Sequence, residues 1–404
     1  MGKELREIAE QLKASPKKVQ LIYAFNGTGK TRLSREFKEL LAPKSDMEDE
    51  GVSSRDKVLY YNAFTEDLFY WDNDLTNDRE PKLKIQQNTF IDWVLREQGD
   101  TGIIENFRRY THDKLMPLFH EVDVVRAGRK TGSKTYPEVT FSFETGSGSS
   151  GNLKISKGEE RTFVWSIFYT LLDEVTSILS DPNADARDDN QFKKLEYVFI
   201  DDPVSSLDDT HLIELAVDLA NLIKKSRYHD GEGLRFIITT HSPLFFNILH
   251  NELNNDLKNP VQSGTPTWLY KRGQSEKYRL EGKTDGKFEL FKSNDRPFSY
   301  HLFLLSEVRK AIRDEQVSKY HFAFLRNILE KTATFLGYSH WEDLLEKAGE
   351  DIKSSSIVRR INFSSHSAHA GEEITDIQSK DIEQLDELVN FLTNTYGFNK
   401  QEAK

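Results

Sequence analysis

The sequence of 404 residues predicts an α/β fold class: a domain built on a mainly parallel sheet, followed by a mostly α-helical C-terminal domain. Two observations lead to this prediction. In the first part of the chain, short unbroken apolar runs alternate with amphipathic stretches, a pattern typical of buried parallel strands covered by helices. From residue 298 onward, the apolar residues recur almost wholly at helical spacing.

Composition excludes several classes of protein. No apolar run approaches the ~18 residues that a membrane helix needs, and the first residues lack an apolar signal core and a myristoylation signal. The absence of cysteine excludes disulfides, thiolate metal sites and cysteine nucleophiles. A formal net charge of -11 argues against indiscriminate coating of nucleic acid, although a local basic site is compatible with it. We expect a protein of the bacterial cytoplasm.

The predicted elements begin with a strand and a helix on either side of a glycine-rich loop. The run "KKVQLIYAF" (17–25) predicts the strand, and Leu33 and Phe37 recur at helical spacing in "TRLSREFKELL" (31–41). A polar, acidic loop separates this helix from a second strand-like run, "KVLYYNAF" (57–64). A hairpin-like segment, a helix, a buried strand, a second helix and another buried strand follow at 127–152, 161–179, 197–201, 210–225 and 235–241.

A change of composition marks the boundary between the two domains. Residues 259–296 are rich in Gly, Lys, Asp and Ser and contain two short strand-like pieces. The stretches after them predict helices at 300–312, 319–337 and 381–396. We therefore expect a first domain at 1–265, a linker at 266–297 and a helical domain at 298–404.

The loop "AFNGTGKT" (24–31) matches the phosphate-loop pattern G-x-x-x-x-G-K-[ST] at its last three positions and departs from it at Ala24. Its glycines allow backbone N–H groups to turn toward a β-phosphate, its lysine reaches the β/γ oxygens, and its threonine offers a hydroxyl to Mg²⁺. An ordinary glycine turn before a helix is the alternative. The predicted nucleotide-binding residues are Asn26, Gly27, Gly29, Lys30 and Thr31.

Two acidic residues end the apolar run in "YVFIDDPVSSLDD". Asp201 suits a Mg²⁺ ligand together with Thr31, and Asp202 would lie beside the γ-phosphate, although two such acids can also merely cap the next helix. Three further short motifs favour the nucleotide site over a helix cap: "SKGEE" precedes a helix, "SSLD" follows the acidic pair, and "FIITTHS" closes a later strand. They add Ser156, Gly158, Glu159, Asp208 and His241 to the candidate residues.

In order along the chain, these elements resemble the Walker A, signature, Walker B, D-loop and switch-histidine motifs of ABC-type P-loop NTPases. The resemblance implies a head-to-tail nucleotide sandwich, hence a homodimer or higher oligomer, with Mg²⁺ and GTP or ATP. Lys157 and Glu159 depart from the usual signature, and Asp202 stands where glutamate is common, which favours slow hydrolysis. Gln86 and Gln87 are the nearest candidates for the Q-loop glutamine.

The helical region carries a second set of polar residues. Arg326 and Glu330 are four residues apart on one predicted helix, a spacing that usually means an ordinary surface ion pair. His366 lies in "INFSSHSAHAGEE", where His369 competes with it and where a lone histidine is usually a surface residue. Spacing alone therefore does not predict a catalytic site.

The runs "YYNAFTEDLFYWDNDL", "YVFIDDPVSSLDDTHLIELAV", "LRNILEKTATFLGY" and "RINFSSHS" resemble the PrrC-type anticodon nucleases, tRNA ribonucleases fused to an ABC-type NTPase and associated with type I restriction systems. The resemblance implies that Arg326, Glu330 and His366 form the nuclease triad. It also implies a tRNA(Lys) substrate cut beside the wobble base, 2′,3′-cyclic phosphate and 5′-hydroxyl ends, and a role in antiphage defence. A HEPN-like helical fold is the candidate for the nuclease domain.

Further expectations come from the same resemblance. It favours GTP over ATP, a thymidine nucleotide as a separate effector, and a type I restriction-modification complex as the silencing partner. Anticodon contacts are expected near Ser293, Asn294 and Asp295. A metal-independent ribonuclease needs a base, an acid and a cation over the phosphorane, and Glu330, His366 and Arg326 can supply them. The alternative function is a chromosome-maintenance or repair ATPase that clamps nucleic acid without cutting RNA; a metal-dependent DNA nuclease is disfavoured by the lack of clustered carboxylates.

Overall fold

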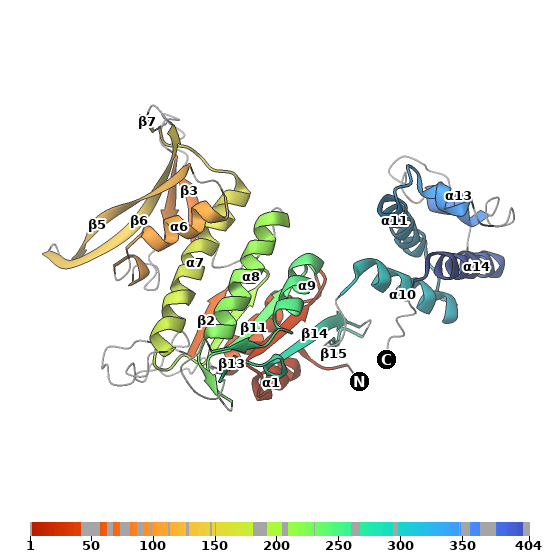
Figure 1. Ribbon diagram of the computed structural model, residues 1–404, viewed down its shortest axis with the longest axis horizontal. Helices are drawn as coiled ribbons and strands as arrows, with labels where there is room; N and C mark the ends of the chain where they lie inside the picture. The colour runs from red at the N-terminus through yellow and green to blue at the C-terminus, as the bar shows by residue number, and fades with distance from the viewer. Residues whose placement is uncertain are drawn as a thin grey trace. The chain divides into compact units, whose positions relative to one another are not determined.

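The computed structural model divides into two compact units, Met1–Pro297 and Phe298–Lys404, which are described separately (Figure 1). The structure describes residues 2–41, 57–62, 68–72, 81–86, 93–96, 99–111, 114–126, 129–145, 148–149, 151–180, 192–203, 209–229, 231–259, 267–283, 285–293, 298–346, 348, 356–363 and 377–398. Within these ranges, no helix is both long enough and apolar enough to cross a membrane.

A six-stranded, mainly parallel sheet organises the first unit, as the sequence predicts. The strands lie in the order β15 (Phe288–Lys292), β14 (Ser275–Gly282), β1 (Val19–Tyr23), β11 (Arg235–Thr240), β8 (Tyr197–Asp201) and β2 (Val58–Tyr61). Every neighbouring pair is parallel except β14 and β15. Because β1, β11 and β8 are neighbouring parallel strands, their carboxyl ends meet at one edge of the sheet, the usual place for a ligand in such folds.

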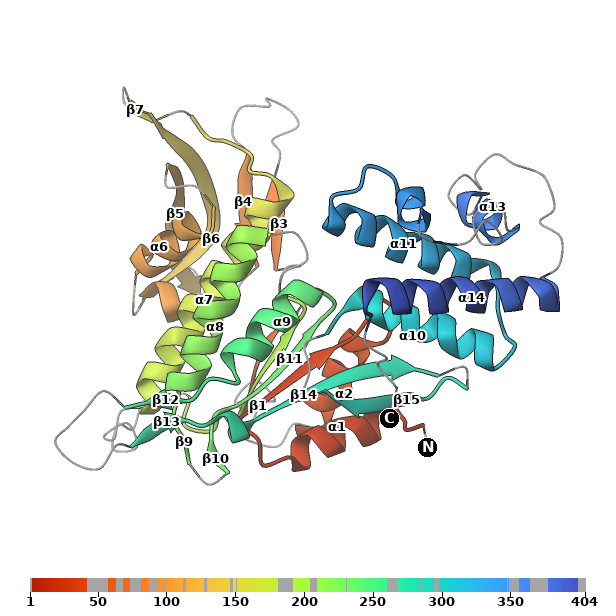
Figure 2. The same cartoon turned by 45° about the vertical axis from the view of Figure 1, so that its right-hand side comes forward.

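Helices cover both faces of this sheet. On one face, α1 (Leu5–Ala14) and α2 (Lys30–Leu41) pack against alternate strand residues, including Ile22 and Phe199. On the other face, Phe246 of α9 (Pro243–Glu252) contacts Tyr23, the next residue of β1, with ring centroids 5.8 Å apart. Figure 2 shows α1 and α9 on opposite sides of β1. Helix α8 (Asp209–Lys225) packs beside α9.

An antiparallel sheet forms the other part of the first unit. It contains β3 (Phe69–Asp72), β4 (Lys82–Ile85), β6 (Arg129–Thr145) and β5 (Leu115–Arg126), and β7 (Gly148–Ser149) pairs with β6. Its inner face packs on α6 (Thr101–Arg109) and on α7 (Lys157–Ser180) through a cluster of aromatic rings. The ring centroid of Phe163 lies 5.0 Å from that of Phe141 and 5.3 Å from that of Phe107. The predicted hairpin is therefore longer than 127–152, because β5 pairs along most of β6 (Figure 1).

The segment expected as a linker, 266–297, contributes strands to the first unit. It contains β13 (Trp268–Tyr270), β14 and β15, of which β14 pairs directly with β1. Its polar composition suggested a linker, but the polar side chains of β14 are buried with partners: Lys277 Nζ donates to Asn254 Oδ1 at 2.5 Å and to Ser275 Oγ at 2.7 Å. The first unit accordingly continues to Pro297 instead of ending at residue 265.

Short elements complete this unit. They are β9 (Tyr228–His229) with β10 (Glu232–Gly233), β12 (Leu257–Lys258) with β13, and the 3₁₀ turn η2 (Arg272–Gln274).

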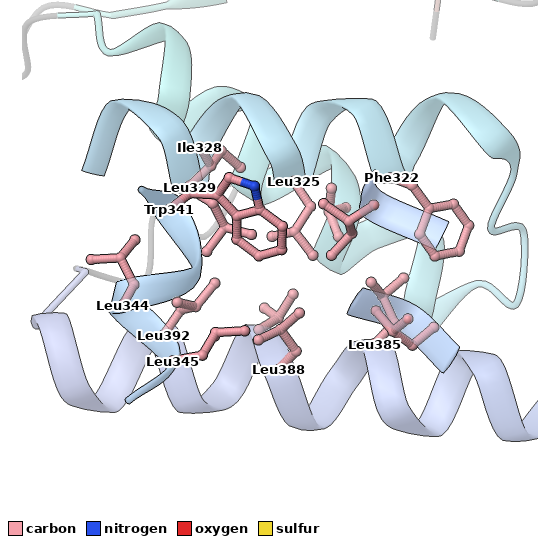
Figure 3. Close-up of a cluster of buried hydrophobic side chains, with 14 of the residues drawn as sticks. Phe322, Leu325, Ile328, Leu329, Trp341, Leu344, Leu345, Leu385, Leu388 and Leu392 are labelled. Carbon is pink, nitrogen blue, oxygen red and sulfur yellow. The ribbon is translucent and has the colours of Figure 1, made fainter. Parts of the chain in front are cut away.

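The second unit is helical throughout its described residues, as predicted. It consists of α10 (Tyr300–Arg313), α11 (Lys319–Leu336), the 3₁₀ turn η3 (Trp341–Leu345), α13 (Ser356–Phe363) and α14 (Ser379–Tyr396). Its core lies between α11 and α14, where Phe322, Leu325 and Leu329 face Leu385 and Leu388 (Figure 3). A HEPN-like arrangement of these helices stays a prediction.

Candidate functional site

The glycine loop joins β1 to α2 at the carboxyl edge of the parallel sheet. Gly27 has a φ of 79° and Gly29 a φ of 92°, in the left-handed region where a side chain would be strained. A Cβ added at Gly27 would meet nothing within 4 Å, so the backbone conformation itself requires glycine there. The loop therefore has the backbone that turns successive N–H groups toward an anion.

Lys30 begins α2 and is buried against this loop. Its Nζ lies 3.2 Å from Asn26 Oδ1 and 3.3 Å from the carbonyl oxygen of Ala24. The same Nζ lies 3.6 Å from Asp202 Oδ2. The ammonium thus sits between the loop and the acidic strand end, where a phosphate could replace these oxygens as its partner.

Asp201 ends β8 next to the glycine loop. Its Oδ2 accepts a hydrogen bond of 2.7 Å from Thr31 Oγ1, and its Oδ1 accepts one from Thr239 Oγ1 on β11. Burial raises the pKa of the Asp201 carboxyl above its ordinary value, because the charged form is removed from water. A buried carboxylate beside a hydroxyl is an oxygen donor set that fits Mg²⁺, which would also offset the cost of burying the charge.

Asp202 follows directly and bonds to His241. Both carboxylate oxygens lie 2.6–2.7 Å from His241 Nδ1, and the His241 backbone N–H donates to Oδ1 at 3.2 Å. Burial alone would raise the pKa of Asp202, but the hydrogen bond from His241 and the charge of Lys30 outweigh it and hold that pKa below its ordinary value. The backbone of Asp202 is left-handed, with a φ of 56°. This carboxylate is thus held ionised in a fixed orientation.

The signature residues open α7. Ser156 and Glu159 form a reciprocal capping box, in which the Ser156 N–H donates to Glu159 Oε2 at 2.7 Å and the Glu159 N–H donates to Ser156 Oγ at 3.2 Å. Gly158 lies between them in the first turn, where its carbonyl accepts from Thr162 Oγ1. In this single chain, each of these two side chains therefore accepts a hydrogen bond from the backbone N–H of the other residue.

The Q-loop candidates and the predicted anticodon contacts lie only partly within the described residues. Gln86 follows β4 in the antiparallel sheet, where its N–H donates to the carbonyl of Leu68. Ser293 extends the β14–β15 ladder through a hydrogen bond of 2.8 Å from its N–H to the Lys277 carbonyl. Outside the described residues lie Gln87, Asp208, Asn294, Asp295, His366 and His369.

Arg326 and Glu330 meet on α11. Arg326 Nε donates to Glu330 Oε1 at 2.7 Å, and Arg326 Nη1 reaches the Ile361 carbonyl of α13 at 3.4 Å. The Arg326 side chain is 21% exposed and that of Glu330 48%. Arg326 is thus a guanidinium shared between two helices, with a carboxylate beside it at the surface, and α13 ends three residues before His366.

The same spacing occurs in α1 without these features. There, Arg6 and Glu10 are 3.9 Å apart and have side chains 58% and 56% exposed. They form an ordinary solvated pair of the kind that contributes little to stability.

Thr239 was missed in the sequence. Its hydroxyl bonds to Asp201 from the neighbouring strand, and its register partner is Asp201 itself. The available signal was a hydroxyl residue near the end of a buried apolar strand, "FIITT", which is an unusual composition for a strand interior.

Comparison with known proteins identifies the family. Residues 137–393 match a family model described as an AAA domain. The chain is 46% identical over 434 aligned positions to a curated anticodon nuclease from Escherichia coli, with all of both chains covered. A crystal structure of an SMC head bound to the C-terminal winged-helix domain of ScpA aligns with a TM-score of 0.32 at 9% identity, covering 69% of this chain and 90% of that one. The chain belongs to the family of PrrC-type anticodon nucleases and carries an AAA-type NTPase domain.

Proposed function

We propose that this chain is a nucleotide-gated anticodon nuclease that cleaves tRNA(Lys) beside the wobble base and leaves 2′,3′-cyclic phosphate and 5′-hydroxyl ends. The observation that carries the proposal is the Arg326–Glu330 contact, in which the guanidinium is anchored to α13. It occurs in a chain that is 46% identical to an anticodon nuclease.

The residues suit this chemistry without a metal. Attack by the ribose 2′-hydroxyl needs a base, the departing 5′-oxygen needs a proton, and the phosphorane needs a cation. Arg326 is always charged and presents a planar fork of donors to phosphate oxygens. Glu330 and His366 divide the proton transfers, with Glu330 favoured as base and His366 as acid.

The first unit would gate this reaction by binding GTP or ATP with Mg²⁺. Lys30 and the N–H groups of the glycine loop would hold the phosphates, and Thr31 with Asp201 would hold the metal. Asp202, oriented by His241, would act on the attacking water. Ser156 and Gly158 of a second copy would close the site, so the active form is a homodimer or a higher oligomer.

The remaining parts of the proposal rest on family membership. The substrate is a single-stranded anticodon loop, which proteins read through stacking and base-edge contacts, so an acidic chain can bind it. Ser293, Asn294 and Asp295 are the proposed anticodon contacts. A type I restriction-modification complex would keep the nuclease silent, and a thymidine nucleotide would act as a separate effector. The cell compartment would be the bacterial cytoplasm, and the role antiphage defence.

The proposal is tested by incubating the full chain with total bacterial tRNA, with GTP, with ATP and without nucleotide, and by mapping new 5′-hydroxyl ends. We expect one cut in the lysine anticodon loop. Glu330→Gln and His366→Ala should each lower its rate by at least ~10²-fold, the usual range for loss of an acid or base. Glu10→Gln is the matched control, because it removes the carboxylate of the equivalent pair on α1.

Two results would contradict the proposal. Intact tRNA under all conditions, from protein that hydrolyses nucleotide, would favour the chromosome-maintenance ATPase. Equal cleavage by wild-type and Lys30→Ala protein in every nucleotide condition would exclude the gating role while leaving the nuclease in place.

A further inference from the structure

Basic side chains of the described residues gather at the amino ends of the parallel strands, at the edge of the sheet opposite the glycine loop. There, Lys17 Nζ donates to the Gly273 carbonyl at 2.6 Å, and the neighbouring Lys18 Nζ donates to the Ser226 carbonyl at 2.7 Å. These bonds bring together the cations that flank Gly273 and Ser226 along the chain. We call the following residues the basic cluster: Lys17, Lys225, Arg227, Lys258, Lys271 and Arg272.

An exposed tryptophan joins the basic cluster through the β12–β13 pair. Lys258 of β12 is the register partner of Trp268 of β13, and its Nζ lies 5.3 Å from the centroid of the indole ring. Strand β13 ends at Tyr270, directly before Lys271. The Trp268 residue is 42% exposed. Figure 2 shows β12 and β13 at the end of α8, where Lys225 lies. The surface therefore carries an aromatic ring as well as positive charge.

The first unit does not neutralise the basic cluster with carboxylates. On the antiparallel sheet, by contrast, Lys130 pairs with Asp123 and Lys134 with Glu121. Among the residues that the structure describes, none of the cations in the basic cluster forms an ion pair with a carboxylate. Their charges therefore remain available to an anion from outside the unit.

Two carboxylates beside the basic cluster are used by other groups. Glu252 pairs with the buried Lys224 at 3.0 Å, and Asp256 Oδ1 accepts the backbone N–H of Arg272 at 2.7 Å. They offset part of the positive charge, but the cations outnumber them.

The positive charge of Lys17 reaches the sheet. Burial lowers the pKa of Lys277 on β14 to about 8, and the charge of Lys17 acts in the same direction. An anion bound at the basic cluster would relieve this repulsion between the two lysines.

A nucleic acid with an unpaired base fits this combination of groups. Lysine and arginine neutralise backbone phosphates and release their counterions. An exposed tryptophan offers a ring on which an unpaired base can stack. Only the anticodon loop of a tRNA needs to enter a nuclease site, so the phosphates of its helices and its unpaired 3′ end are free to contact another surface.

We propose that the basic cluster and Trp268 bind the substrate tRNA outside its anticodon loop, with the cations on backbone phosphates and the indole ring stacked on an unpaired base. The inference rests on the tRNA cleavage of the proposed function and adds to it a second RNA contact, on the first unit. This contact lies at the edge of the sheet that a nucleotide at the glycine loop would leave free. Because two contacts on one RNA reinforce each other, a full-length tRNA should bind more tightly than its isolated anticodon stem-loop.

The test compares these two RNAs on the full chain carrying Glu330→Gln, the substitution expected to prevent cleavage. Fluorescence anisotropy measures the Kd of full-length tRNA(Lys) and of its anticodon stem-loop from about 50 to about 200 mM salt. We expect Lys271→Glu combined with Arg272→Glu to weaken binding of the full-length tRNA at least about tenfold relative to the stem-loop. The slope of log K against log salt for the full-length tRNA should fall by about 1 to 2.

A matched control makes the same change in net charge elsewhere on the first unit. Lys130→Glu combined with Lys134→Glu alters the antiparallel sheet and should leave the ratio of the two Kd values unchanged. Urea unfolding of each variant verifies that it is folded. If the Lys271 and Arg272 double variant does not fold, Lys258→Glu, at an exposed position of β12, takes its place.

The stacking contact is tested separately. Trp268→Ala should weaken binding of the full-length tRNA at least about fivefold, and Trp268→Tyr, which keeps a ring, should restore most of the loss. Equal losses in the alanine and tyrosine variants would contradict stacking at this position.

Several outcomes would overturn the inference. Equal Kd values for the full-length tRNA and the stem-loop would do so, as would an equal loss in the control variant. Duplex DNA that binds the basic cluster as tightly as tRNA would contradict the assignment to the substrate. Unchanged tRNA binding together with altered self-association of the variants in sedimentation would assign the surface to a protein contact.

The same measurements separate this inference from the proposed function. If the wild-type chain neither bound nor cut tRNA or the stem-loop, the proposed function would fall, and the inference with it. If the wild-type chain cut tRNA and the variants of the basic cluster bound it unchanged, the inference alone would fall.

Discussion

At the scale of single residues, the backbone of Asp202 explains a departure from the family motif. Its φ of 56° lies in the left-handed region, which aspartate and asparagine adopt far more readily than other side chains do. The conformation lets the carboxylate receive both the side-chain and the backbone N–H of His241. The shorter residue at this position is therefore the one that the local backbone favours.

This leads to a prediction for Asp202→Glu. Restoring the glutamate that is common at this position should not accelerate nucleotide hydrolysis, and it should lower the free energy of unfolding by about 1 kcal/mol because of the left-handed backbone. Urea unfolding and phosphate release measure the two effects. Asp173→Glu, at an exposed position of α7, is the control and should change stability by less than about 0.5 kcal/mol. Faster hydrolysis with unchanged stability would contradict the explanation.

The site shows which residues a sequence can reveal. Lys30, Thr31 and Asp201 belong to local motifs, so their spacing along the chain was enough to predict them. Thr239 joins Asp201 through the register of β11 with β8, which depends on pairing between distant segments. For Arg326 and Glu330, spacing failed for the opposite reason: Arg6 and Glu10 have the same spacing, and the contact of Arg326 with α13 sets its pair apart.

At the scale of elements, two buried lysines tie strands to their neighbours. Lys18, just before β1, donates to the carbonyls of Lys224 and Ser226 at the end of α8, at 3.2 and 2.7 Å. Lys277 of β14 donates to Asn254 and Ser275. These bonds satisfy buried carbonyl and side-chain oxygens, and they place an amino group inside the protein, where burial disfavours its charged form.

The buried lysines predict a pH dependence of stability. Burial lowers the pKa of Lys18 to about 7 and that of Lys277 to about 8. In the unfolded chain both titrate near pH ~10.4, so between these values the unfolded state binds more protons and stability rises with pH. We expect the free energy of unfolding to increase from about pH 7 to about pH 9.5, and this rise to flatten in Lys18→Met and Lys277→Met.

Urea unfolding across this pH range makes the measurement. Lys13→Met, on the exposed side of α1, is the control and should keep the slope of the wild type. A slope that is the same in all four proteins would contradict the assignment.

Some elements were harder to predict than others. Strands β1 and β8 are mainly apolar, as suits strands covered on both faces of the sheet, and they were predicted directly. Strand β5 was missed because two irregularities interrupt its alternation, after His120 and after Asp123, and because it contains Pro117, which a strand at the edge of a sheet tolerates. Strand β14 was seen as strand-like but assigned to a linker, since its buried Glu276 and Lys277 gave it the composition of a loop.

At the scale of the whole molecule, the division into two units predicts where the chain can be cut. A fragment of residues 1–297 keeps β14 and β15, whereas a fragment of 1–265 leaves β1 without its neighbour on one side. We expect the longer fragment to unfold cooperatively in urea and to bind nucleotide, and the shorter one to do neither. Comparable unfolding of both fragments would show that the last two strands are dispensable.

The second unit offers the complementary comparison. Its core lies between α11 and α14 and is formed by its own residues, so a fragment of 298–404 should retain helical circular dichroism and a cooperative transition. Truncation before α14 should abolish both, because that helix supplies Leu385, Leu388 and Leu392 to the core.

The short connection between the edge strand and the first helix of the second unit limits how far the two can separate. Strand β15 ends at Lys292 and α10 begins at Tyr300, so seven residues, 293–299, join them. Even fully extended, a segment of this length spans no more than about 25 Å. A connecting segment of this length keeps each helical unit at an effective concentration on the order of millimolar relative to its own sheet. The covalent connection therefore stands in for part of the affinity that two separate chains would need.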